Sequence, residues 1–114
     1  MSPALQSAWL SEVAAVRVAI SRRETETAFL HLERAHILSQ RFTRRHVYVH
    51  WLMLKLGLSV GDWREVIGQI SRMVAACLFS RIWIPVGNTG RATVSAFRPM
   101  AIPEDLRSIL EQCN

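Results

Sequence analysis

The sequence has few cysteines, a single lysine and no long hydrophobic run, and each shortage excludes a class of protein. Cys77 and Cys113 are too few for a disulfide framework, and neither has a second thiol at metal-ligand spacing. No apolar run reaches the roughly 18 residues that a membrane span requires. The first residues show no basic region followed by an apolar core, so no signal peptide is predicted. We therefore expect a location in the reducing cytoplasm.

The positive charge of the chain is carried by arginine. Lys55 is the only lysine, and the formal net charge is +5 at pH 7. Arg22 and Arg23 close the first predicted helix, while Arg41, Arg44 and Arg45 follow the second. In an antiparallel hairpin the two groups lie at opposite ends. Basic and aromatic residues do not alternate as they do in RNA-binding motifs. The spread of the arginines argues against nucleic acid, and the lack of a long apolar run argues against a membrane. A protein partner or a homo-oligomer is the remaining expectation.

Half of the 114 residues are hydrophobic and 20% are charged, which suits one folded domain over residues 1–114. The hydrophobic residues recur at helical spacing, so the pattern predicts an all-α fold. Two arrangements fit it, a four-helix bundle or two stacked tetratricopeptide-like helical hairpins. A Gly/Pro-rich loop is predicted over residues 84–102. Helices are predicted over residues 3–21, 25–40, 43–58, 62–80 and, for a short C-terminal helix, 103–112.

Two helix starts are marked by capping residues. Ser2 precedes Pro3 at the start of the first helix, and Asp62 with Glu65 forms a capping-box pattern at the start of the fourth. Apolar periodicity then predicts which face of each helix is buried. The predicted buried residues are Leu5, Trp9, Val13, Val16 and Ile20 on the first helix and Val66, Ile67, Ile70, Val74, Cys77 and Leu78 on the fourth.

Three of the four histidines fall on the hydrophobic stripes of the second and third predicted helices. His46 and His50 are four residues apart, so one helical turn brings both imidazoles to a common centre. If these helices form an antiparallel hairpin, His36 on the second faces both of them. Three converging imidazoles are a ligand set for zinc. His31 points away from the stripe, and we expect it to be solvated.

Two further residues complete the predicted metal site. Glu33 lies three residues before His36, and we expect it to be a fourth ligand or an acceptor that orients an imidazole. Met53 is a conditional ligand whose thioether would indicate copper. The Glu33-x-x-His36 spacing occurs in di-iron bundles, but this chain has one such pair where a complete site needs two. The predicted ion is therefore zinc or copper.

The competing interpretation is that the histidines are neutral core residues hydrogen-bonded to carbonyl groups or to Glu33. A proton-transfer role is a third possibility. No nucleophile motif is present, so an enzyme is not favoured and no catalytic residue is assigned. Tyr48 and Trp51 lie on the outer face of the third predicted helix and would suit a partner surface. The sequence thus predicts a metal-binding or metal-stress accessory protein, with a non-catalytic protein–protein interaction module without metal as the alternative.

Three blocks read ERAHILSQ, HVYVHWLML and PVGNTGRATVSAFRPMAIPEDL, and together they reach over nearly the whole chain. They resemble the signature blocks of a family of small bacterial helical proteins catalogued as a domain of unknown function. The resemblance implies a link to metal chemistry, because genes of such proteins often lie beside heavy-metal resistance or metal-responsive regulator genes. The third block contains the predicted loop, which we expect to lie over the mouth of the histidine site.

Overall fold

The computed structural model describes residues 1–79, 90–91 and 99–112, and within these ranges it contains five helices and no strand. The all-α prediction is therefore confirmed. Most of the predicted loop over 84–102 lies outside the described residues, as does the side chain of Cys77. The helices are α1 (Pro3–Ser21), α2 (Thr25–Ser39), α3 (Thr43–Val60), α4 (Trp63–Phe79) and α5 (Glu104–Gln112).

Both predicted capping residues accept the expected hydrogen bonds. The Ser2 hydroxyl oxygen accepts from the backbone N–H of Leu5 at 3.2 Å, and the Asp62 carboxylate accepts from that of Glu65 at 3.1 Å. Between α3 and α4, Gly61 adopts the left-handed conformation with φ of 73°, which glycine reaches without the steric cost of a side chain. Gly61 and Asp62 set the reversal of direction that makes α3 and α4 a hairpin.

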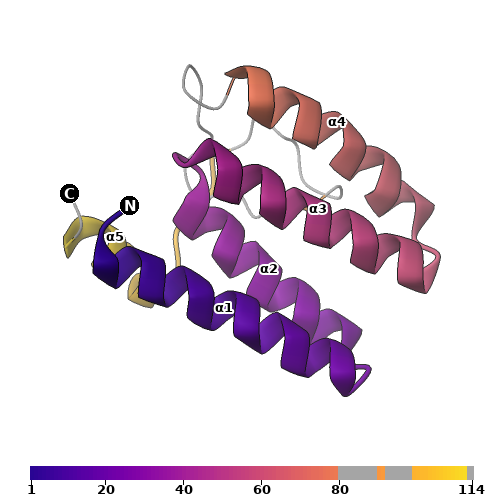
Figure 1. Cartoon of the computed structure of the whole chain (residues 1–114), viewed down its shortest axis with the longest axis horizontal. Helices are drawn as coiled ribbons and strands as arrows, with labels where there is room; N and C mark the ends of the chain where they lie inside the picture. Colours follow the sequence, from indigo (N-terminus) through magenta and orange to yellow (C-terminus); the bar gives the residue numbers. More distant parts are fainter. Residues whose placement is uncertain (80–89, 92–98, 113–114) are drawn as a thin grey trace.

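The four long helices lie side by side in chain order (Figure 1). α1 packs on α2, α2 on α3 and α3 on α4, and in the described part of the chain α1 does not reach α4. A closed four-helix bundle would bring the first and last helices together. Of the two arrangements that the sequence left open, the structure is therefore the row of two helical hairpins, with α5 packed against α1 and α2.

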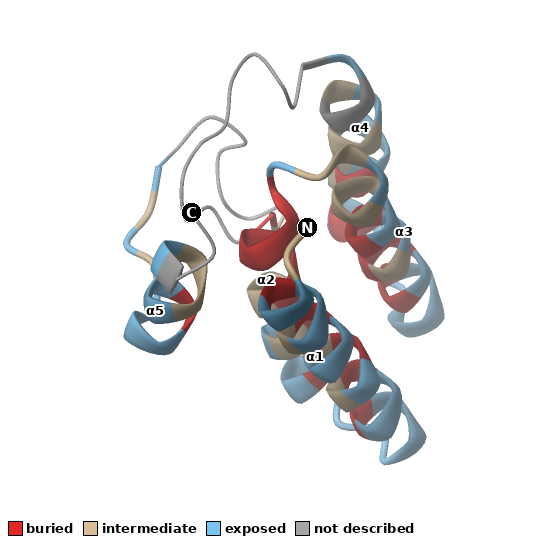
Figure 2. Ribbon diagram, turned by 60° about the vertical axis from the view of Figure 1, so that its left-hand side comes forward, coloured by how far each residue is buried: buried red, intermediate tan, exposed pale blue. Residues whose placement is uncertain are grey.

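The hydrophobic core is centred on α2, the helix with neighbours on most sides. Figure 2 shows the buried residues of the long helices turned toward one another. Phe29 and Leu32 of α2 pack with Val16 of α1, Met53 of α3 and Leu106 of α5 in one cluster. Full burial of side chains of this size stabilises by about 1.5–3 kcal/mol each. The cluster therefore fixes the position of α2 and α3, which carry the three histidines.

The prediction for the buried face of α4 was largely wrong. Val66 is buried as expected, but Ile67, Ile70, Val74 and Leu78 are more than half exposed, and the buried polar residues are Glu65 and Gln69. α4 is the last helix of the row, so among the long helices only α3 covers it. The inward face of α4 carries Glu65 and Gln69. Their side chains hydrogen-bond to Arg91 and to His50. On α1, Ile20 is likewise exposed, and Ala19 is buried in its place.

Candidate metal centre

The hairpin of α2 and α3 brings three histidines to one point. His36 lies in the last turn of α2, and His46 and His50 occupy successive turns at the start of α3. Because α2 and α3 are joined by a short connection and pack on each other, the end of one faces the start of the other. The predicted convergence of the three imidazoles is present in the structure, and their ligand nitrogens all lie within 4.8 Å of one another.

The same ring nitrogen of each histidine points at the shared centre. The Nε2 atom of His46 lies 2.9 Å from Nε2 of His36 and 3.1 Å from Nε2 of His50. The ring centroids are 4.6 to 4.8 Å apart. His36 and His50 are 3% and 2% exposed, and His46 is partly buried. Three Nε2 atoms therefore converge in a site that water reaches poorly.

Burial keeps two of the three imidazoles in the neutral form that can bind a metal. Desolvation, with the neighbouring His50 acting in the same direction, lowers the pKa of His46 to about 3. Desolvation also lowers the pKa of His50 to about 4, with Arg72 acting in the same direction and Gln69 and Glu65 opposing it. At neutral pH both rings are therefore uncharged. An incoming cation does not have to displace a proton from a charged imidazolium.

A hydrogen-bond chain fixes which nitrogen of His50 carries the proton. The Gln69 amide nitrogen donates to Glu65 Oε2 at 2.6 Å and to the Gly90 carbonyl oxygen at 2.8 Å, and neither of those groups can donate in return. The amide oxygen of Gln69 therefore faces His50 Nδ1 and accepts its N–H. The lone pair of His50 is then left on Nε2, directed at the other two rings.

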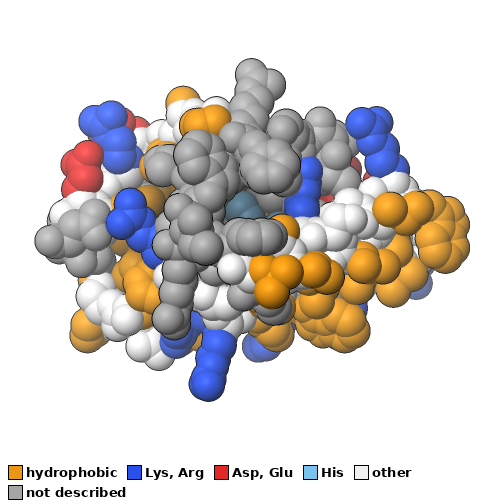
Figure 3. Space-filling view, turned by 90° about the horizontal axis from the view of Figure 1, so that it is seen from above, with side chains coloured by type: hydrophobic (Ala, Val, Ile, Leu, Met, Phe, Trp, Pro, Cys, Tyr) orange, Lys and Arg blue, Asp and Glu red, His pale blue; other side chains and the backbone are white. Residues whose placement is uncertain are grey.

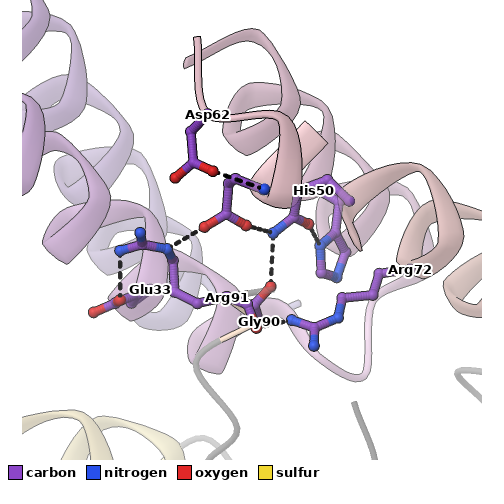
Figure 4. Close-up of polar contacts among 8 residues, drawn as sticks. Glu33, His50, Asp62, Arg72, Gly90 and Arg91 are labelled. Carbon is purple, nitrogen blue, oxygen red and sulfur yellow. Dashed lines mark hydrogen bonds and ion pairs between the residues drawn. The ribbon is translucent and has the colours of Figure 1, made fainter. Parts of the chain in front are cut away.

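The chain continues through an arginine to a second carboxylate, as Figure 4 shows. Glu65 is 1% exposed, and its carboxylate accepts from Arg91 Nε, while Arg91 Nη1 donates to Glu33 at 3.3 Å. The same guanidinium lies 3.9 Å from the centre of the Phe29 ring. Arg72 donates to the backbone carbonyl of Arg91. Arg91 thus offsets two buried or half-buried negative charges beside the histidines.

Gly90 lies directly against the His36 ring. It is buried, has φ of 82°, and its carbonyl accepts from Gln69. A β-carbon built on Gly90 would lie 2.6 Å from His36 Cδ2 and 2.9 Å from His36 Nε2, which is closer than real atoms approach. Only glycine satisfies both the backbone angle and this close approach. Gly90 therefore lies against His36, while most of the loop that we expected over the site lies outside the described residues.

Glu33 and Met53, the other two predicted ligands, have different surroundings. The Glu33 carboxylate is paired with Arg91, and burial raises its pKa. Met53 is fully buried within the hydrophobic core cluster. His31, which we expected to be solvated, is only partly exposed, and its Nδ1 lies 2.7 Å from Glu12 Oε2. The group that converges on one point consists of the three imidazoles.

Sequence reasoning missed Glu65, Gln69 and Arg91 as parts of the site. Glu65 and Gln69 are four residues apart and share one face of α4, which was the available signal. Arg91 meets carboxylates 26 and 58 residues away in the sequence, and no local pattern identifies such a pairing. Gly90 lay in the predicted loop, but its approach to His36 depends on the tertiary packing.

The donor set and spacing fit a transition-metal ion after a small adjustment. Zinc–nitrogen distances of about 2.0–2.1 Å in a tetrahedral site place the ligand nitrogens about 3.3 Å apart. The observed separations of 2.9 and 3.1 Å are also hydrogen-bond lengths. In such a hydrogen-bonded trio, His46 Nδ1 is buried with no partner in the described part of the chain. Widening these two separations by a few tenths of an ångström would reach the tetrahedral value, and the ligand nitrogens of His36 and His50 lie within 4.8 Å of each other.

Within the described residues, no helix has the length and hydrophobicity that crossing a bilayer demands. No curated protein and no solved structure matches the chain significantly. A family model does match it, over residues 3–110, which contain every residue of the site described above. The chain belongs to the family described as "Protein of unknown function (DUF3703)".

Proposed function

We propose that this protein binds a single zinc or copper ion through Nε2 of His36, His46 and His50 and serves as a metal-binding or metal-stress accessory protein. The observation that carries the proposal is the convergence of three Nε2 atoms at 2.9 and 3.1 Å in a buried site. Nε2 of His46 lies within hydrogen-bond distance of Nε2 of both other histidines, so the three lone-pair positions face one region. A cation at their centre would satisfy all three together.

The surroundings of the trio support metal binding rather than simple core packing. In many metal sites a ligating histidine donates its other N–H to an outer acceptor, which fixes the ring and raises its basicity. His50 has this arrangement toward Gln69, and Glu65 and Gly90 hold the amide in turn. A core histidine would need only one acceptor. A chain of three orienting groups is more than packing requires.

Zinc is the first choice among the two metals. Three imidazole nitrogens suit zinc and copper alike, whereas a thioether or thiolate would favour copper. Met53 lies in the apolar core cluster, so nitrogen dominates the donor set. Gly90 lies against His36, so a bound ion would be shielded from a large substrate. We therefore favour holding or sensing the metal over catalysis, in the cytoplasmic location expected from the cysteine content.

The runner-up function is a protein–protein interaction module that needs no metal. Tyr48 and Trp51 are both exposed on α3, and such aromatic residues often anchor interfaces. This reading treats the histidine trio as a structural element alone. The two functions differ in one observable, the metal content of the purified protein.

The test is metal analysis of protein prepared without a histidine tag. We expect about one equivalent of zinc or copper per chain, and a lower melting temperature after chelation. At a free zinc concentration about 100 times Kd, re-addition should stabilise the protein by about 2.7 kcal/mol. The double variant His46→Ala/His50→Ala, and the milder His46→Gln, should lose the metal and the zinc-dependent stabilisation.

The matched control is His31→Ala, which removes a histidine that pairs with Glu12 away from the trio. It should retain the metal and the zinc-dependent stabilisation. Wild-type protein that binds neither zinc nor copper at neutral pH, even when each is added, would rule out the proposal. Equal metal retention by His31→Ala and His46→Gln would place the ion somewhere other than the trio.

A further inference from the structure

The outward face of α4 carries a row of exposed large hydrophobic side chains. Their exposed fractions lie between 51% and 66%, although apolar groups of this size are usually buried. Figure 3 views the molecule from above and shows hydrophobic side chains gathered along its lower right edge. We call the row the α4 seam, and its members are Trp63, Ile67, Ile70, Val74 and Leu78.

The spacing of the α4 seam is that of a helix-pairing surface. From Trp63 to Val74 the members are separated by four, three and four residues, which is the alternation that keeps one stripe along a helix facing a partner helix. Ile67 and Val74 are β-branched, as is common where two helices pair. Scattered exposed hydrophobic residues need no explanation, but a stripe in register over four turns does.

The α4 seam is large enough to contribute most of a dimer interface. Side chains of this size, exposed by half to two thirds, present roughly 500 Å² of apolar surface, which is near the upper end for a monomer. A stable interface buries about 800 Å² on each partner. The row alone is therefore smaller than that value, so the proposed dimer must also bury residues that flank it.

We propose that the α4 seam is a homodimer interface in which the α4 helices of two copies pack antiparallel about a two-fold axis near Ile70. In this arrangement Trp63 of one copy lies opposite Leu78 of the other, and Ile67 lies opposite Val74. The pairing is self-complementary because the two-fold axis presents the same stripe to itself. Trp63 contributes the aromatic anchor that interfaces commonly use.

Charge on α4 favours a second copy, and favours the antiparallel orientation. Arg64 is the one exposed charged residue among the described side chains of α4, since Glu65 is buried and Arg72 is partly buried. An acidic partner helix would find little on the seam to pair with. Parallel helices would bring the two Arg64 side chains together, whereas antiparallel helices separate them and oppose their dipoles.

The dimer is independent of the metal site. The α4 seam lies on the outward face of α4, while Glu65 and Gln69, which reach the histidine trio, lie on the inward face. Dimerisation is therefore expected with and without metal. A protein that dimerises without binding metal would leave this inference intact and remove only the proposed function.

The first experiment measures the mass of the untagged full chain by sedimentation equilibrium over a concentration series, with and without chelator. We expect a monomer–dimer equilibrium with the dimer dominant at tens of micromolar. Ile70→Glu places a charge at the centre of the seam and should weaken the dimer at least about a hundredfold. The control Leu30→Glu, at an equally exposed leucine of α2, should leave the mass unchanged.

Circular dichroism of both variants should match the wild type, because both positions are exposed. A monomeric wild type at every concentration, or an Ile70→Glu dimer as tight as the wild type, would overturn the proposal. Orientation is tested by cysteine crosslinking in a Cys77→Ser/Cys113→Ser background. Antiparallel packing predicts a disulfide between mixed Trp63→Cys and Leu78→Cys chains. Crosslinking of Trp63→Cys chains with themselves alone would indicate parallel helices and overturn the assigned geometry.

Discussion

Gln69 decides which nitrogen of His50 carries the proton. Its amide nitrogen is committed to Glu65 and to the Gly90 carbonyl, so its oxygen can only accept from His50. A free imidazole interconverts between two tautomers, and only one of them presents Nε2 as a lone pair. The amide therefore prepares His50 for a cation before any cation arrives. Gln69 acts on the site through His50, as a positioning residue.

Removal of this amide should weaken the metal site without removing a ligand. We expect Gln69→Met to lower zinc affinity by about 10–100-fold, the range typical of lost outer-shell partners. Competition with a fluorescent zinc chelator measures this change. Ser71→Ala, at an exposed position of the same helix, is the control and should keep the wild-type affinity. An unchanged affinity in Gln69→Met would mean that the tautomer of His50 is set by something else.

Local patterns could predict those site residues that lie at helical spacing or close together in the sequence. His46 and His50 fall on one helical face, and a short turn to α2 suffices to bring in His36. The hydrogen bond that fixes the His50 tautomer is made to Gln69, 19 residues further along the chain. Gln69 is held in turn by the carbonyl of Gly90, which is distant in the sequence. Hydrophobic periodicity carries no information about such contacts.

Among the helices, α4 departs from the usual rule that a helix buries its apolar face and exposes its polar face. Its polar pair, Glu65 and Gln69, faces inward and the α4 seam faces outward. The sequence pattern predicted the opposite, because periodicity identifies an apolar stripe but not which partner covers it. The buried ion pair of Glu65 with Arg91 and the amide bonds of Gln69 favour the observed orientation. A second copy on the seam would complete the burial.

The short helix α5 is held by one buried leucine and one arginine bridge. Leu106 is 1% exposed within the core, and Arg34 of α2 pairs with both Glu12 of α1 and Asp105 of α5. We expect Leu106→Ala to reduce the free energy of unfolding by about 2–5 kcal/mol, because it leaves a cavity. Asp105→Asn should cost less than about 1 kcal/mol, since Asp105 is largely exposed.

Urea unfolding measures both α5 variants, with Ser108→Ala as the exposed control on the same helix. We expect the free energy of unfolding to be much lower for Leu106→Ala than for Asp105→Asn. The value for Asp105→Asn should lie near that of Ser108→Ala. If Asp105→Asn were as damaging as Leu106→Ala, the arginine bridge rather than apolar burial would be what docks α5.

At the scale of the whole molecule, the neutral histidines make stability depend on pH. In the unfolded chain a histidine has a pKa of about 6.5, whereas in the folded protein the pKa of His46 is about 3 and that of His50 about 4. Between these values the unfolded chain binds protons that the folded chain does not. Stability is therefore full above about pH 6.5 and falls as the pH drops toward 4.

For metal-free protein, each of these histidines should contribute a slope of up to about 1.4 kcal/mol per pH unit below pH 6. Urea unfolding at pH 7, 6 and 5 measures it. His46→Gln should reduce the slope to the part contributed by His50, and His31→Ala should keep the wild-type slope, because His31 lies outside the trio. A wild-type profile that is flat between pH 7 and 5 would mean that the imidazoles are accessible to protons in the folded protein.

The central claim, that three Nε2 atoms bind one ion, is tested most directly by NMR of the histidine ring nitrogens during titration with zinc. Before zinc is added, we expect His50 to carry its proton on Nδ1. On titration, the Nε2 signals of His36, His46 and His50 should shift together and saturate at one equivalent. The signals of His31 should stay unchanged. Zinc that leaves the three Nε2 signals in place, or that shifts His31 instead, would contradict the account.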